Sequence, residues 1–204
     1  MASNSEKIVW IDCEMTGLDL VNDALIEVAV LITDSELNVV DEGIQVVIKP
    51  EPQAVAQMDD FVRNMHQVSG LLQELDGGIT IDEAQRIVVD YIKKHVPEAK
   101  KALLGGNSVG TDKNFLMRDM PEVIEHLHYR IIDVSTLKEL SRRWYPKAHY
   151  AAPAKTGNHR ALGDIQDSID ELRYYRAAIM VPAPGPTTDE SRKIAASISS
   201  PEFK

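Results

Sequence analysis

The sequence has one cysteine, few aromatic residues and no long apolar run, and each shortage excludes a class of protein. Because Cys13 is the only cysteine among 204 residues, an internal disulfide is impossible, which suits a reducing compartment. The first seven residues lack the basic start and apolar core of a secretory signal, and no apolar run approaches the about 20 residues that cross a bilayer. Aromatic residues make up 5% of the chain, so the core must be mainly aliphatic. We therefore expect a cytoplasmic protein with no membrane partner.

Basic residues are also scarce, with 22 lysines and arginines against 32 acidic residues and a formal net charge of -10. This balance argues against a broad basic surface that holds long nucleic acid or an anionic membrane. It does not exclude a short anionic ligand, because a few local cations or a bound metal can reverse the sign of the potential inside one cleft.

The order of the predicted elements favours an α/β fold, in which helices cover a mixed sheet. β-branched runs predict an initial antiparallel meander, and helical spacing alternates with short strands after it. The expected domain covers residues 7–180, with a flexible N-terminus (1–6) and a poorly ordered C-terminal extension (181–204). Strands are predicted at 7–15, 25–33, 44–48, 102–106 and 129–134. Helices are predicted at 81–96, from a start near 108 or 111, from a cap at Ser135 or Thr136 to 144, and at 160–179. A loop is predicted at 145–158.

Two acidic residues interrupt the first apolar strand. Asp12 and Glu14 are two residues apart, so both carboxylates lie on the same face of the sheet. Like charges held side by side repel unless a cation lies between them, and oxygen ligands of this kind suit hard divalent ions such as Mg²⁺. Alternatively, this face is solvated, or each acid pairs with a lysine or arginine.

Three further residues extend the acidic pair, although each has an ordinary explanation. Asp112 follows a Gly-Gly-Asn-Ser segment, where an aspartate in a first helical turn would offset the helix dipole. His159 and Asp164 lie at the start of the last helix, where a lone histidine is often structural. Together, four carboxylates and one histidine can hold two Mg²⁺ ions and leave the histidine as a general base for phosphodiester hydrolysis.

Five motifs occur in order between about residues 7 and 180. They are WIDCEMTGL at 10–18, GNSV at 106–109 with Asp112 and 115–116, HYRIIDVS at 128–135, RRWYP at 142–146, and HRAL at 159–162 with Asp164. The Asp-x-Glu motif alone would be a weak signal, whereas five ordered motifs are highly specific. By these motifs the chain resembles the DEDDh 3′→5′ exonucleases of the ribonuclease H-like superfamily, and within that group the oligoribonuclease family.

The resemblance implies a five-stranded mixed sheet in a homodimer, and a 3′→5′ exoribonuclease. Its substrates would be very short oligoribonucleotides, above all 5′-phosphorylated dinucleotides, which it would hydrolyse to nucleoside 5′-monophosphates. The implied metal ligands for two Mg²⁺ or Mn²⁺ ions are Asp12, Glu14, Asp112 and Asp164, with His159 as general base. The implied substrate-binding residues are Leu18 as a wedge between bases, Phe61 near the base pocket, His66 near the 3′ end, Ser108, Arg130, Ser135 and Thr136 at the 5′ phosphate, and Tyr129 reaching into the partner subunit's site.

Without the resemblance, four of these residues have ordinary interpretations. Tyr129 would pack on the core, His66 would be a surface histidine, Leu18 a turn residue and Ser135 a helix cap. Two positions depart from the family pattern: Gly163 replaces a frequent aspartate, and Phe61 replaces a frequent tryptophan.

Two other functions remain open on the sequence. One is an exonuclease that acts on longer RNA or on DNA ends, which would need a basic track or an attached partner. The other is a non-catalytic module that senses dinucleotides. A degenerate site of that kind should have lost an acid or His159, and the chain retains all five of these residues.

Overall fold

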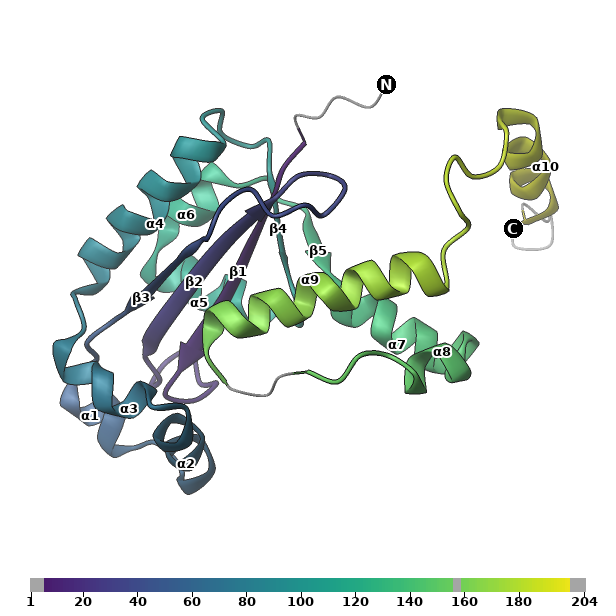
Figure 1. The fold of residues 1–204 in the computed structure, drawn as a ribbon. Coiled ribbons are helices and arrows are strands. Elements are labelled where there is room, and N and C mark those ends of the chain that lie inside the picture. Colours follow the sequence, from purple (N-terminus) through teal and green to yellow (C-terminus); the bar gives the residue numbers. More distant parts are fainter. Residues whose placement is uncertain (1–5, 156–158, 199–204) are drawn as a thin grey trace, which may run out of the picture.

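A five-stranded mixed sheet forms the centre of the protein (Figure 1). The computed structural model describes residues 6–155 and 159–198. The strand order is β3-β2-β1-β4-β5, so the predicted fold class is confirmed. The strands are β1 (Ile8–Met15), β2 (Leu25–Thr33), β3 (Ile44–Val47), β4 (Leu103–Gly106) and β5 (Ile131–Asp133).

The register of the sheet confirms the predicted initial meander. β1 pairs with β2 and β2 with β3 in antiparallel fashion, whereas β4 runs parallel to β1 and β5 parallel to β4. Every residue of β2 is buried, as expected for a strand covered on both faces. In the β1–β2 register Asp12 lies opposite Ala29, and Glu14 lies opposite Glu27.

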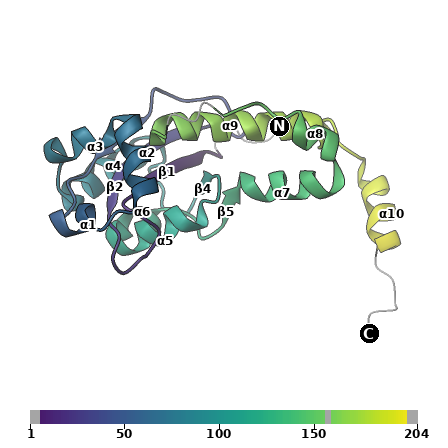
Figure 2. The same cartoon turned by 90° about the horizontal axis from the view of Figure 1, so that it is seen from below.

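Helices cover both faces of the sheet (Figures 1 and 2). α9 crosses the face that carries Asp12 and Glu14, with α7 beside it, and α4, α5 and α6 cover the opposite face. Their bounds are α4 (Ile81–His95), α5 (Gly110–Asp119), α6 (Pro121–His126), α7 (Val134–Trp144) and α9 (Ala161–Ala178). A group of short helices covers one end of β2: α1 (Pro52–Ala56), α2 (Asp60–Ser69) and α3 (Leu71–Glu74), followed by the 3₁₀ turn η1 (Leu75–Gly77).

Alternate residues of β1 enter two separate cores. Ile11 and Cys13 pack with α4 and α5, so the cysteine lies on the face opposite the two acids. Trp10 packs under α9 and donates a hydrogen bond from its indole nitrogen to Thr33 Oγ1 at 3.0 Å. The polar acids of β1 therefore lie at the end of an otherwise apolar face, against the start of α9.

Three local predictions differ from the structure. The cap of α7 is Asp133, whose side chain accepts a hydrogen bond from Ser135 N, so Ser135 and Thr136 lie inside the helix. The predicted loop at 145–158 contains the short helix α8 (Pro146–Tyr150), and its residues 156–158 lie outside the described part. The short helices α1 to α3 were not predicted.

The chain after α9 forms one further helix, α10 (Thr188–Ile198), which buries none of its residues and lies away from the sheet (Figures 1 and 2). The outer parts of the predicted flexible terminus and extension, residues 1–5 and 199–204, lie outside the described residues. Within residues 6–155 and 159–198, no helix combines the length and apolar character that a bilayer crossing requires.

Candidate active site

Three carboxylates meet where β1 ends against the first turn of α9. Asp12, Glu14 and Asp164 each offer an oxygen within 4.8 Å of the others. The spacing of two along β1 directs the first pair toward α9, and Asp164 meets them from the first turn of that helix. The predicted convergence of these three acids is therefore present in the structure.

Burial raises the pKa of all three carboxyl groups, and repulsion between the acids adds to it at Asp12 and Glu14. Burial is the largest cause at Asp12, whose pKa rises well above its usual value, with repulsion from Asp112 next. Burial and then repulsion from Asp164 raise the pKa of Glu14 to about 8. Burial also raises the pKa of Asp164. A divalent cation among these oxygens would remove the repulsion, so the donor set fits Mg²⁺ or Mn²⁺.

Asp112 reaches the same strand from the other face of the sheet. Its Oδ1 accepts a hydrogen bond from the backbone N–H of Cys13 at 2.9 Å, between the two acids of β1. Burial raises its pKa to about 6. Asp112 is not part of the three-carboxylate group, so the structure places the fourth predicted ligand beside the cluster rather than inside it.

His159 lines the same cavity as the three carboxylates, a space of about 470 Å³. The residue is exposed and precedes the first residue of α9 by two positions, as the sequence predicted. Its backbone is left-handed, with φ 49°, a conformation that His tolerates better than most side chains. The charge of His159 lowers the pKa of Asp164, which lines the same cavity.

A hydrogen-bonded group of hydroxyl and amide side chains, here called the hydroxyl wall, also lines this cavity. Ser108 Oγ lies 3.1 Å from Ser135 Oγ, and Ser135 Oγ donates to Asn107 Oδ1 at 3.0 Å. Ser108 N also lies 2.9 Å from Ser135 Oγ. The structure thus brings together two of the predicted phosphate-binding residues, which are 27 positions apart in the chain.

Two lysines that the sequence interpretation did not single out also line this cavity: Lys138 and Lys155. Lys138 Nζ lies 3.4 Å from Glu171 Oε1, whereas Lys155 is exposed and lowers the pKa of both Asp12 and Asp164. A lysine four residues before the histidine motif was the available signal for Lys155. These cations supply the local positive charge that the net charge of the chain lacks.

His66 is fully buried, so its interpretation as a surface histidine is wrong. Its Nε2 lies 2.9 Å from the carbonyl oxygen of Met15, and its Nδ1 lies 3.9 Å from Glu14 Oε2. Burial lowers the pKa of this imidazole. The end of α2 is thereby held against the end of β1, beside a carboxylate of the cluster.

The other predicted substrate-binding residues are on the surface. Leu18 and Phe61 expose 75% and 77% of their area, and Tyr129 exposes 72%, so the interpretation of Tyr129 as a core aromatic is wrong. Arg130 Nε donates to the Tyr129 hydroxyl at 3.2 Å, and Thr136 is exposed on α7. None of these five residues lines the carboxylate cavity.

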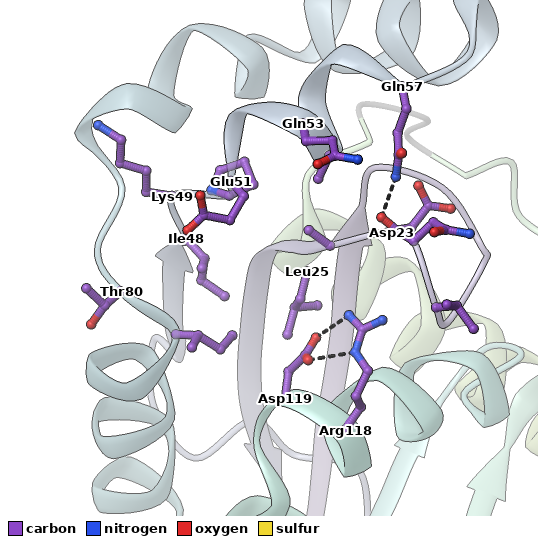
Figure 3. Close-up of a pocket in the computed structure, with 16 residues that line it drawn as sticks. Asp23, Leu25, Ile48, Lys49, Glu51, Gln53, Gln57, Thr80, Arg118 and Asp119 are labelled. Atoms are coloured by element: carbon purple, nitrogen blue, oxygen red, sulfur yellow. Dashed lines mark hydrogen bonds and ion pairs between the residues drawn. The ribbon is translucent and has the colours of Figure 1, made fainter.

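A larger cavity of about 630 Å³ lies behind the β1–β2 loop (Figure 3). The loop carries Leu18, and two side chains of the cavity wall hold its backbone: Arg118 donates to the carbonyl of Leu20, and Gln57 to that of Asn22. Arg118 also pairs with Asp119 at 2.6 Å. Asp12, Glu14 and Asp164 do not line this cavity, so the larger of the two cavities is not the candidate active site.

Comparison with known proteins identifies the family. The profile of the RNase_T family, described as exonuclease, matches residues 9–172. An oligoribonuclease of Streptomyces griseus is 59% identical over 197 residues, which is 97% of this chain and 98% of the relative. The chain belongs to the oligoribonuclease family. Oligoribonucleases of Cutibacterium acnes and Mycobacterium leprae are 60% and 51% identical, over 93% and 95% of this chain and 94% and 91% of theirs.

Solved structures show that this oligoribonuclease family member has an exonuclease fold. An exonuclease I from Methylocaldum szegediense superposes with a TM-score of 0.61 at 16% identity, over 85% of this chain and 41% of that one. E. coli exonuclease I in complex with a dA16 oligonucleotide gives a TM-score of 0.67 at 14% identity, over 85% and 41%. The chain spans about two fifths of those proteins. Family and fold together make the chain a nuclease.

Proposed function

We propose that the protein is a 3′→5′ exoribonuclease that hydrolyses very short oligoribonucleotides, especially 5′-phosphorylated dinucleotides, to nucleoside 5′-monophosphates. The observation that carries this proposal is the cavity itself. Its lining combines Asp12, Glu14, Asp164 and His159 with the hydroxyl side chains of Ser108 and Ser135. Family membership supports a short RNA substrate, because the relatives are named oligoribonucleases.

The acidic cluster would hold two divalent ions, Mg²⁺ or Mn²⁺, with Asp12, Glu14 and Asp164 as ligands and Asp112 beside them. Bound there, the ions supply Lewis-acid activation of water and neutralise charge on the scissile phosphate. The raised pKa values of Glu14 and Asp112 support this role, because burial makes the ionised carboxylates unfavourable without a cation, and repulsion from Asp164 adds to this at Glu14.

His159 would act as the general base that accepts a proton from the attacking water. Its exposure leaves the imidazole accessible, and the residue lines the same cavity as the three carboxylates, which supports this role. A general base needs to lie within hydrogen-bond reach of the proton it removes, directly or through one water.

The hydroxyl wall would bind the 5′ phosphate of the substrate. Ser108 and Ser135 already share a hydrogen bond, and Thr136 follows on the same helix near its N-terminus, where free N–H groups favour anions. Arg130 would add a planar, charged donor set. A phosphate bound at this wall would leave little room for a longer strand, which accounts for a preference for dinucleotides.

The exposed apolar residues would hold the bases. Leu18 would insert between the two bases and Phe61 would stack near one of them, because large exposed apolar side chains near a site offer contact area. His66, buried against Glu14, would lie near the 3′ end.

Tyr129 would complete the site of a second subunit in a homodimer. It precedes β5, which is the edge strand of the sheet, and its ring is exposed. We further propose that the protein works in the cytoplasm, that residues 7–180 form the catalytic domain, and that residues 181–204 form an extension. The lack of buried residues in α10 supports the last point.

Digestion of 5′-phosphorylated RNA from two to seven nucleotides, followed over time, tests the proposal. We expect the dinucleotide to be consumed fastest and the longer strands much more slowly. Faster turnover of the longer strands, or of DNA ends, would identify a general exonuclease, and binding without turnover in Mg²⁺ and Mn²⁺ would identify a sensor. In the same assay Arg130→Ala should lose the preference for 5′-phosphorylated dinucleotides over the longer strands. If this variant cleaves dinucleotides and long oligomers in the same ratio as the wild type, the proposed phosphate site is contradicted.

A further inference from the structure

A second buried carboxylate lies directly across the sheet from Glu14. Glu27 is its register partner on β2, and the side chain of Glu27 is fully buried. Like charges placed directly opposite each other in an antiparallel pair destabilise the sheet, and a buried carboxylate needs charged or hydrogen-bonding partners. Glu27 therefore needs a compensating cation close to the proposed metal site.

Arg160 supplies that cation. Its Nε and Nη2 lie 3.0 and 2.7 Å from Glu27 Oε1. The backbone N–H of Ala161 donates to Glu27 Oε2 at 2.9 Å, and Gln45 Nε2 donates to Oε1 at 2.9 Å. The charge of Glu27 is thus bound by the residues that begin α9.

The same guanidinium also binds a second carboxylate from another part of the fold. Arg160 Nη1 and Nη2 lie 2.9 Å from Glu74 Oε1 and Oε2, which is the paired geometry that a guanidinium makes with a carboxylate. Because Glu74 lies on α3 and Glu27 on β2, one side chain fastens the start of α9 to both elements.

Arg160 lies between two groups of the proposed site. It follows His159 directly, and its carbonyl accepts the hydrogen bond from Asp164 N at 3.1 Å. The left-handed backbone of His159 is sparsely populated and persists only where the surrounding structure holds it. The contacts of Arg160 with Glu27 and Glu74 restrain the backbone on the C-terminal side of His159.

We propose that Arg160 is a positioning residue that binds Glu27 and Glu74 and thereby holds Asp164 and His159 against the carboxylates of β1. This role rests on the proposed metal-dependent function. Charge alone does not suffice for it, because a lysine ammonium cannot form the planar double contact to two carboxylates.

Binding of Mn²⁺ to the full chain, measured by titration calorimetry, tests this role without relying on turnover. Arg160→Lys keeps the charge and should weaken Mn²⁺ binding about 10–100-fold, the usual effect of losing a group that orients metal ligands. Glu74→Gln removes the charge of only one of the two carboxylates that bind Arg160 and should cause a smaller loss of Mn²⁺ affinity. The control is Arg176→Lys on the same helix, which alters an exposed pair with Glu36 and should bind Mn²⁺ like the wild type.

The half-saturating Mn²⁺ concentration for dinucleotide turnover should rise in parallel with the dissociation constant. If both variants bind Mn²⁺ with wild-type affinity and only unfold at a lower temperature, Arg160 is a structural ion pair and the role is refuted. Should Arg160→Lys fail to fold, Glu74→Gln decides, because that side chain is half exposed. A wild type that binds no Mn²⁺ would overturn the proposed function and this role with it.

Discussion

Asp112 on α5 accepts a hydrogen bond from the backbone N–H of Cys13 on β1, with 2.9 Å between Oδ1 and the nitrogen. The bond crosses from a covering helix to the strand segment that lies between Asp12 and Glu14. It gives Asp112 two separable functions: its oxygen anchors α5 to β1, and its charge adds to the acidic cluster.

Substitutions at Asp112 should separate these functions. Asp112→Asn keeps an acceptor for Cys13 N–H but removes the charge, so we expect near-normal unfolding by denaturant with turnover lowered about 10–100-fold. Asp112→Ala leaves the buried N–H without a partner and should cost about 1–3 kcal/mol more in unfolding free energy than the Asn variant. Equal turnover in Asp112→Asn and the wild type would show that the charge is not needed.

Metal-free protein should become less stable as the pH rises. Glu14 ionises in the unfolded chain near its usual pKa of 4.5 but retains its proton up to about 8 when folded, and Asp112 retains its proton up to about 6. Between these values the folded state binds more protons than the unfolded state, so the unfolding free energy falls with increasing pH. Thermal unfolding in EDTA from pH 5 to 8.5 measures this slope.

Divalent ions should reverse this fall in stability with rising pH, because they bind the ionised carboxylates. An ion at 100 times its Kd adds about 2.7 kcal/mol, and at about 2–4 °C per kcal/mol this raises Tm by about 5–11 °C. Glu14→Gln removes one of the titrating groups and should reduce the slope in EDTA. A wild-type Tm that is independent of pH in EDTA would contradict the assigned proton uptake.

The strands, the long helices and the acids of β1 were predictable because their signals are local. The limits of β2 follow from its continuous β-branched run, and the shared face of Asp12 and Glu14 follows from their spacing of two. α8 falls in the predicted loop at 145–158, because proline usually interrupts a helix, whereas Pro146 occupies the first turn of α8, where proline is favoured. The proposed role of Arg160 could not be predicted from the sequence, because its partners Glu27 and Glu74 are 133 and 86 positions away in the chain.

Replacing His159 should abolish most turnover and leave metal binding intact. His159→Asn is the sharper variant, because Asn tolerates the left-handed backbone at φ 49° and the loss then reports on the imidazole. Removing a general base usually costs about 10²–10⁴-fold. His149→Ala on α8 serves as the histidine control and should keep wild-type turnover. A normal rate in His159→Asn would mean that another group accepts the proton.

Leu18 should matter for substrate and not for the fold. The side chain is 75% exposed on a loop whose backbone is held by Arg118 and Gln57, so Leu18→Ala should change the unfolding free energy by less than about 0.5 kcal/mol. If Leu18 lies between the two bases, its loss removes contact area and raises KM for dinucleotides about 10-fold or more, a cost of about 1–3 kcal/mol. Val21→Ala is the matched control, because Val21 is 86% exposed on the same loop. Parallel changes in KM in both variants would show that the loop acts through its general apolar character, whereas a change confined to Leu18→Ala supports the wedge.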